Sequence, residues 1–153
     1  MIKFGRYIIP GYTHTPQAGS PQVRVRRTHN WGREGILEVR SAPGGRDIAI
    51  THVLVVGSEG SEYKLVTAKL LELDGAIGQN GRLEVYGHLT AAASVASHLF
   101  INSTFDEWTQ LPFPGQESAG PIKDLAGCFG GGWIMKMQLR FHQVLPRRAQ
   151  AGG

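Results

Sequence analysis

The chain has 153 residues, of which 41% are hydrophobic and 18% are charged, and its formal net charge at pH 7 is +4. This length excludes two well-packed domains, because a chain of this size buries roughly 70% of its unfolded surface in a single core. The charged fraction lies below the ~25% of a typical soluble domain. We therefore expect part of the surface to be covered by other molecules.

The 21 glycines and 8 prolines favour many turns between short strands over a helix bundle. The single cysteine, Cys128, excludes an internal disulfide and a zinc site built from several thiolates. No run of 18 apolar residues predicts a transmembrane helix, and residues 1–12 lack the apolar core of a signal peptide. We expect a mainly β protein that is made in a cytoplasm and does not insert into a membrane.

The first 40 residues predict an arm followed by a hairpin. Residues 1–22 combine a short apolar run with a polar, proline-containing stretch, which indicates a short strand and an extended arm from Tyr7 to Pro21. Residues 23–27 alternate apolar and basic side chains at the period of a strand with one buried face. Residues 36–40 form a second strand-like run, so we expect the two to pair as a hairpin.

The next segment predicts a turn, a buried strand and a helix. Pro43 to Asp47 has turn chemistry, and Ile48 to Val56 is rich in β-branched residues on both alternating sets. The period then becomes helical over 61–74, with Ser61 as the expected N-cap and Gly75 as the stop. The apolar face of this helix comprises Tyr63, Val66, Leu70 and Leu73.

The C-terminal half predicts three more strands and one long loop. Residues 82–89 and 94–102 are strand-like runs separated by an alanine-rich link. Residues 106–127 hold three prolines and read as a long loop that contacts neighbouring molecules. The clearest strand covers 133–142, where one alternating set is apolar and the other mostly polar. The core set is Trp133, Met135, Met137, Leu139 and Phe141.

Together these elements predict an antiparallel β-sandwich or split barrel with one flanking helix over about 61–74 and long loops. We assign residues 1–22 to an N-terminal strand and arm, residues 23–146 to the sandwich domain, and residues 147–153 to a flexible tail.

Patterns typical of catalysis and cofactor binding are missing from the sequence. The glycine-rich run 127–132 precedes a strand, whereas a phosphate-binding loop precedes a helix. The spacing around Ser118 does not fit a Gly-x-Ser-x-Gly nucleophile turn. The six histidines show neither His-x-His nor His-Glu-x-x-His spacing. We expect no enzymatic activity, no cofactor and no metal.

Basic and aromatic residues gather between positions 24 and 33. Two roles fit this cluster: it could clamp a phosphate backbone and stack a base, or it could pair with carboxylates of a neighbouring subunit. We take as candidate interface or nucleic-acid contacts Arg24, Arg26, Arg27, Trp31 and Arg33, together with Trp108 and Phe113 from the predicted long loop. A third alternative is a carbohydrate-binding module that uses Trp31, Trp108 and Trp133.

The order of motifs resembles the tail-tube-like ring domain of phage distal tail and baseplate proteins. The pieces that carry the resemblance are the turn Pro43 to Asp47, the leucine-patterned helix Lys64 to Asp74, the strand Gly81 to Val85, a late Asp124 and Gly127, and the closing Leu139-Arg140-Phe141. The likeness covers roughly residues 36–146. The chain is too short for the additional C-terminal domain of full-length distal tail proteins.

The resemblance implies a structural virion protein of a tail or baseplate, whether distal tail, tail tube or adaptor. It implies a ring of copies, as a hexamer, that contacts neighbouring tail or baseplate proteins, with DNA passing through the lumen without sequence-specific binding. A closed ring would also bury the free strand edges of such a fold. Assembly would take place in the host cytoplasm. The alternative is a small nucleic-acid-binding β-barrel that uses the Arg24–Arg33 segment.

Overall fold

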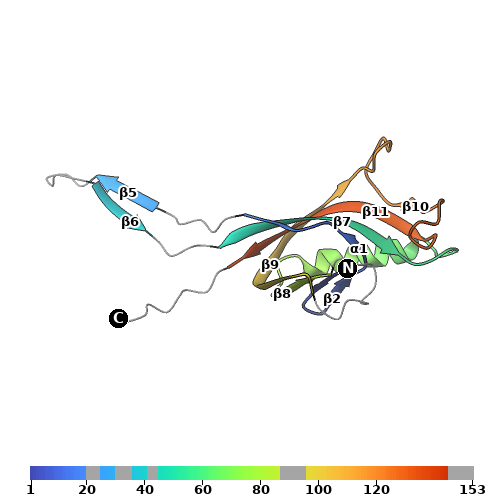
Figure 1. Cartoon of the computed structure of the whole chain (residues 1–153), viewed down its shortest axis with the longest axis horizontal. Coiled ribbons are helices and arrows are strands. Elements are labelled where there is room, and N and C mark those ends of the chain that lie inside the picture. The colour runs from blue at the N-terminus through green and yellow to red at the C-terminus, as the bar shows by residue number, and fades with distance from the viewer. Residues whose placement is uncertain (20–24, 30–35, 41–44, 87–95, 145–153) are drawn as a thin grey trace.

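The computed structural model of the protein describes residues 1–19, 25–29, 36–40, 45–86 and 96–144. The described residues form a mainly β fold, one antiparallel sheet of nine strands with a single helix and a separate two-stranded hairpin (Figure 1). This confirms the predicted fold class.

The nine strands of the main sheet are short at the N-terminus and long in the centre. In chain order they are β1 (Ile2–Phe4), β2 (Tyr7–Ile9), β3 (Gly11–Thr13), β4 (Gln17–Ala18), β7 (Arg46–Val56), β8 (Asn80–Val85), β9 (His98–Leu111), β10 (Ile122–Lys123) and β11 (Trp133–Gln143). Their order across the sheet is β2-β1-β8-β9-β11-β7-β3, with β4 also pairing with β7 and β10 with β11.

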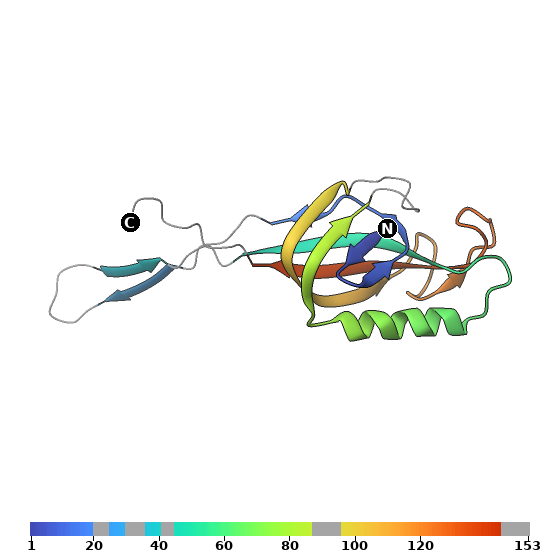
Figure 2. The same cartoon turned by 90° about the horizontal axis from the view of Figure 1, so that it is seen from below.

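The sheet folds over on itself at β9. The first part of β9 pairs with β8, its second part pairs with β11, and the register shifts in both ladders. Such irregularities bend a strand, and Figure 2 shows β8 and β9 crossing over β7 and β11. The two ends of the sheet, β2 and β3, are joined by Pro10 alone. The sheet therefore encloses a core without closing into a barrel of continuous strand pairs.

The seam between β2 and β3 is built around a buried histidine. His52 on β7 is fully buried, its Nε2 donates to the carbonyl of Pro10 (2.9 Å), and Thr13 Oγ1 lies 2.9 Å from its Nδ1. Burial lowers the pKa of His52 from 6.5 to about 4. Next to Pro10, Gly11 has φ 126°, and a Cβ there would collide with the carbonyl of Val53. This crossover requires glycine.

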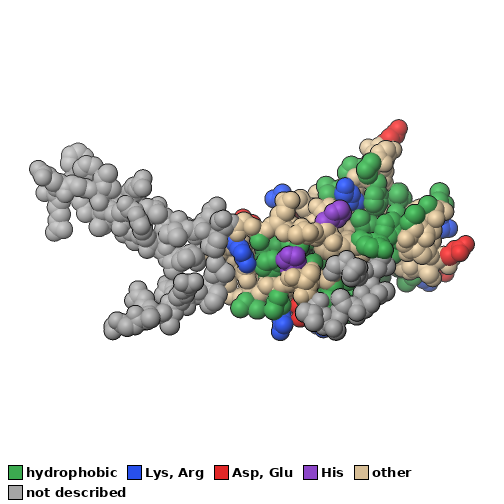
Figure 3. Space-filling model, viewed as in Figure 1, with side chains coloured by type: hydrophobic (Ala, Val, Ile, Leu, Met, Phe, Trp, Pro, Cys, Tyr) green, Lys and Arg blue, Asp and Glu red, His purple; other side chains and the backbone are tan. Residues whose placement is uncertain are grey.

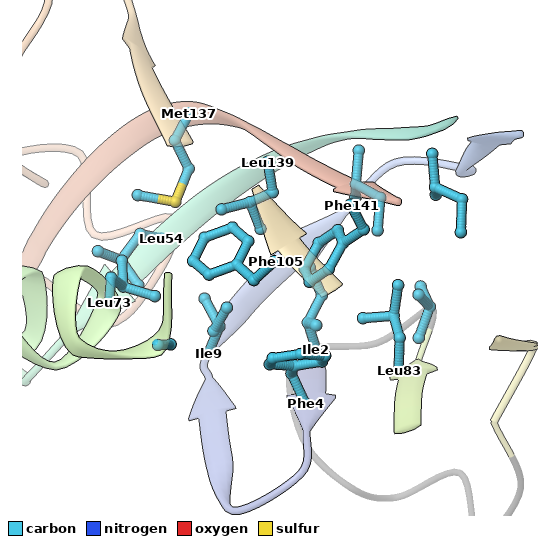
Figure 4. Close-up of a cluster of buried hydrophobic side chains, with 14 of the residues drawn as sticks. Ile2, Phe4, Ile9, Leu54, Leu73, Leu83, Phe105, Met137, Leu139 and Phe141 are labelled. Carbon is cyan, nitrogen blue, oxygen red and sulfur yellow. The ribbon is translucent and has the colours of Figure 1, made fainter. Parts of the chain in front are cut away.

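The core lies between the two halves of the folded sheet. On β11 the alternate residues Met135, Met137, Leu139 and Phe141 are buried, as the sequence predicts. Their partners come from β1, β2, β7, β8 and β9, and the core side chains include Ile2, Phe4, Ile9, Ile48, Ile50, Leu54, Leu83, Val85, Phe100 and Phe105 (Figure 4). The ring of Phe141 lies 4.9 Å from that of Phe105 and 5.3 Å from that of Phe4. Aromatic packing thus joins three strands.

Trp133, predicted on the core face of β11, is the first residue of that strand and is only half-buried. Its indole N–H donates to the carbonyl of Ser61 (3.1 Å), and its ring packs edge-on against Tyr63. The polar indole group thus finds a partner at the start of the helix, as a half-buried tryptophan requires.

The single helix of the described residues, α1 (Lys64–Ala76), covers one flank of the sheet (Figure 2). It begins three residues after the predicted start and ends two residues after the predicted end. Ser61 is not the N-cap, because its hydroxyl accepts the N–H of Ser58 and so stabilises the preceding turn. Gly75 lies inside the last turn and does not end the helix. Val66 and Leu73 are buried as predicted, whereas Tyr63 is half exposed.

Two predicted loop segments are strands. The predicted arm forms β2, β3 and β4 as far as Ala18, and residues 11–19 pair along the edge of β7. The predicted long loop begins only after Leu111, because β9 continues through 106–111. These strands carry few apolar residues on alternating positions, so hydrophobic periodicity does not reveal them. The backbone groups of β7 and β11 need hydrogen-bonding partners; β3 and β4 supply them to β7, and residues 107–111 of β9 supply them to β11.

The remaining strand predictions agree in part. β8 ends at Val85 among the described residues, and β9 starts at His98, four residues after the predicted start. Positions 20–22 of the predicted arm and the tail 147–153 lie outside the described residues. No helix in the described ranges is long and apolar enough to span a membrane.

Candidate interaction surfaces

The predicted hairpin exists and stands apart from the main sheet. β5 (Val25–His29) pairs antiparallel with β6 (Ile36–Arg40), with Arg27 opposite Glu38. Among the described residues, these strands pair only with each other. In Figure 1 the hairpin lies beyond the end of β7, away from the core. An isolated two-stranded hairpin is marginally stable in water, and among the described residues no third strand extends this one.

Of the predicted basic cluster, Arg26 and Arg27 belong to β5. The other three members, Arg24, Trp31 and Arg33, lie outside the described residues. The cluster therefore maps to the hairpin and the positions next to its strands.

The two aromatic residues predicted from the long loop lie on opposite faces of the sheet. Trp108 is on β9, packs against the main core and donates its indole N–H to Asp74 Oδ1 on α1 (2.9 Å). Phe113 follows β9 and packs on the outer face against Val53 and Ile134. The structure does not bring them together, and each has a packing role within its own chain.

A second, smaller apolar cluster lies on the outer face of the sheet. Val53, Val55 and Ile134 are buried beneath half-buried side chains of the 112–132 segment, namely Phe113, Ile122 and Phe129. Figure 3 shows hydrophobic side chains (green) gathered on the right-hand side of the view. Sequence periodicity gives a partial signal for this cluster, since Ile48 to Val56 is apolar on both alternating sets. The covering segment carries no such signal.

Asp124 fixes the turn that covers this cluster. Its buried carboxylate accepts the backbone N–H groups of Phe129 (2.6 Å) and Gly131 (3.1 Å). Burial alone would raise the pKa of Asp124, but these backbone donors reverse the effect, and its pKa lies below the ordinary value. The turn presents Leu125 to solvent with 91% of its surface exposed.

We expect Asp124→Ala to loosen this turn without unfolding the sheet. The variant removes the acceptor of two backbone N–H groups, so the amides of Phe129 and Gly131 should exchange faster with solvent. Hydrogen-exchange mass spectrometry of the 124–132 segment measures the change, with β11 as the internal reference. Because the folded pKa of Asp124 is depressed, its contribution is present at neutral pH and is lost as the pH falls through that pKa. Unchanged exchange in this segment would contradict the assignment.

A groove of about 540 Å³ lies near the hairpin end of β7. It is lined by Gln17, Ala18, Gly19, Asp47, Ile48, Ala49, Asp106, Glu107, Arg140 and Phe141. Asp47 pairs with His142 (2.9 Å) and Glu107 with Arg140 (3.5 Å). Burial raises the pKa of Asp106, as do the nearby carboxylates of Asp47 and Glu107, whereas His142 opposes the shift. The groove joins residues that are far apart in the sequence.

Two carboxylates of the groove have partners within the chain, Asp47 with the His142 ring and Glu107 with the Arg140 guanidinium. In the described ranges, no group of three or more His, Cys, Asp or Glu side chains is placed to hold a metal ion.

Comparison with known proteins adds no relative to these observations. No protein-family model and no curated protein sequence matches the chain.

Proposed function

We propose that the protein is a structural subunit that assembles with copies of itself into a ring, as in a phage tail or baseplate. The observation that carries the proposal is the hairpin β5–β6, which pairs with no other strand of the described residues and lies beyond the end of the sheet (Figure 1). Such a hairpin is marginal by itself and gains stability by packing on a neighbour. A ring lets every copy both give and receive that contact.

Three further features support an assembly role. The charged fraction of the chain is low for a soluble domain. A braced turn exposes Leu125 almost completely. The resemblance of the motif order to tail-tube-like ring domains supplies the virion setting, a hexameric ring with DNA passing through its lumen. Neighbouring tail or baseplate proteins would cover the remaining surfaces. The proposal includes no active site and no cofactor.

The experiment is to excise the hairpin and measure assembly. Gly19 donates its backbone N–H to the carbonyl of Asp47 (2.9 Å), so the two sides of the excision are already adjacent. Replacing residues 21–43 with a short glycine-serine linker should therefore leave the sheet intact. We expect the full chain to form rings at high concentration, seen by negative-stain electron microscopy. The excised variant should stay monomeric with nearly unchanged thermal unfolding.

The matched control is Leu71→Ala, which keeps the hairpin, changes an exposed side chain of α1 that the proposal does not use, and should assemble like the full chain. A full chain that stays monomeric at the highest concentrations, or an excised variant that assembles equally well, would contradict the proposal.

The second candidate function uses the same hairpin, since Arg26 and Arg27 lie on β5. A nucleic-acid-binding hairpin predicts that affinity for a labelled oligonucleotide falls steeply with salt, because phosphate contacts release counterions. Binding that is salt-dependent and lost in the excised variant would favour this function over the ring.

A further inference from the structure

The outer face of the β2-β1-β8-β9 half of the sheet carries a row of four side chains at matching register. Ile8 is opposite Lys3, Lys3 is opposite Glu84, and Glu84 is opposite Leu99. Opposed residues in a ladder point to the same face. Their sequence neighbours Ile2, Phe4, Ile9, Leu83, Val85 and Phe100 are core residues. The row therefore points away from the core.

The two ends of this row are exposed aliphatic side chains. Ile8 is 47% and Leu99 is 48% exposed, and the next outward residue of β9, Ile101, is 51% exposed. Single exposed aliphatic residues are common, but neighbouring ones at successive outward positions mark a contact surface.

The middle of the row holds one charge of each sign. Lys3 is exposed and makes no ion pair with any described residue, although it is opposite Glu84. Glu84 is held in place by Arg82 (Nε to Oε1, 3.2 Å) and by the hydroxyl of Tyr86 (3.2 Å to Oε2). Each carboxylate oxygen can accept a further hydrogen bond. Glu84 is thus oriented, and 18% of its side-chain surface remains exposed for contact with an ammonium group.

Across the four strands the row runs apolar, basic, acidic, apolar. When a second copy faces it in the opposite direction, apolar residues meet apolar residues and each basic residue meets an acidic one. A two-fold axis parallel to the strands brings Ile8 of one copy onto Leu99 of the other and Lys3 onto Glu84, twice. A two-fold axis along the row would place Lys3 on Lys3 and Glu84 on Glu84. Like charges in contact oppose association, so charge selects the first arrangement.

We propose that this face binds the same face of a second copy through that two-fold arrangement. The contact is isologous, with both copies using the same patch, and the sheets pack aligned at about 10 Å. This contact is separate from the ring contact proposed above, because the hairpin β5–β6 does not take part in it. If both contacts form, they join rings in pairs.

Charge exchange tests the arrangement in the full chain. Lys3→Glu and Glu84→Lys each place like charges at both contacts of a homodimer, and each should weaken association by about tenfold or more. The double variant Lys3→Glu/Glu84→Lys should restore it. A mixture of the two single variants should form heterodimers that neither variant forms alone. Sedimentation velocity measures association, and far-UV circular dichroism verifies that each variant is folded.

Cross-linking supplies the second, position-specific measurement. In a Cys128→Ser background, Ile8→Cys and Leu99→Cys chains are treated with a short bis-maleimide. We expect covalent dimers from the mixture and little from either chain alone. Cross-linking of Ile8→Cys with itself, or single charge variants that associate like the unmodified chain, would overturn the proposal. These readouts do not depend on the hairpin, so a failure of ring assembly would leave them interpretable.

Discussion

Replacing Phe141 with alanine is expected to destabilise the protein by about 3–5 kcal/mol, the cost of removing a large buried aromatic ring. Phe141 is 1% exposed, and its ring packs against Phe4 and Phe105 from two other strands. β11 lies between β7 and β9 in the middle of the sheet, so the surroundings have little room to collapse into the cavity. Chemical denaturation measures the free energy of unfolding, and the melting temperature should fall by on the order of 10 °C.

Two control variants should destabilise the protein less than Phe141→Ala does. Phe141→Leu retains most of the apolar volume and should cost less than the alanine variant. Leu125→Ala removes a side chain that is 91% exposed and should change the unfolding free energy by less than about 0.5 kcal/mol. If Phe141→Ala were no more destabilising than Leu125→Ala, the central position of β11 in the core would be wrong.

The second large effect is acid sensitivity at the seam. Burial lowers the pKa of His52 from 6.5 to about 4, so the unfolded chain binds a proton at higher pH than the folded chain does. Stability from this residue is therefore complete above about pH 6.5 and falls as the pH drops towards 4. At 1.36 kcal/mol per pKa unit, the loss reaches about 3 kcal/mol. Below about pH 4, His52 is protonated in the folded protein as well, so the unfolding free energy loses no more from this residue.

His52→Gln tests this assignment. The glutamine amide can donate to the carbonyl of Pro10 and does not titrate. Unfolding free energies measured from pH 7 to pH 4 should fall less steeply for the variant than for the unmodified chain, and the difference should lie between pH 6.5 and 4. Carboxylates that titrate in the same range are common to both proteins and cancel in the comparison. Parallel pH profiles would show that His52 is not the group responsible.

The sequence predicts the centre of the fold better than its periphery. Apolar residues at the strand period predict β11, and β-branched residues on both alternating sets predict β7; the structure contains both strands. The hairpin β5–β6 was predicted from alternation at the same period. The sequence does not predict the second half of β9, because residues 106–110 hold a single apolar residue, Trp108, and so show no apolar alternation. α1 begins later than the sequence predicts because Ser61 stabilises the preceding turn. It ends later because Gly75 continues the helix.

The candidate surfaces depend on contacts between distant segments, which one sequence does not reveal. The groove combines residues near positions 18, 47, 106 and 140. The row from Ile8 to Leu99 exists only because β1 pairs with β8. A pattern within one segment predicts an element, whereas a surface requires the pairing of elements. Trp108 and Trp133, which the carbohydrate alternative uses, each donate their indole N–H within the chain, to Asp74 and to the carbonyl of Ser61.

The pairing of β1 with β8 also constrains how the protein is made. β1 precedes β8 in the chain, and residues 83–85, its sheet neighbour on one side, are synthesised roughly eighty residues later. Until then the edge of β1 towards β8 has no strand partner. Long-range strand pairing of this kind slows folding and leaves aggregation-prone intermediates exposed. We expect the nascent chain to depend on chaperones, and synthesis at lower temperature to increase the yield of folded protein.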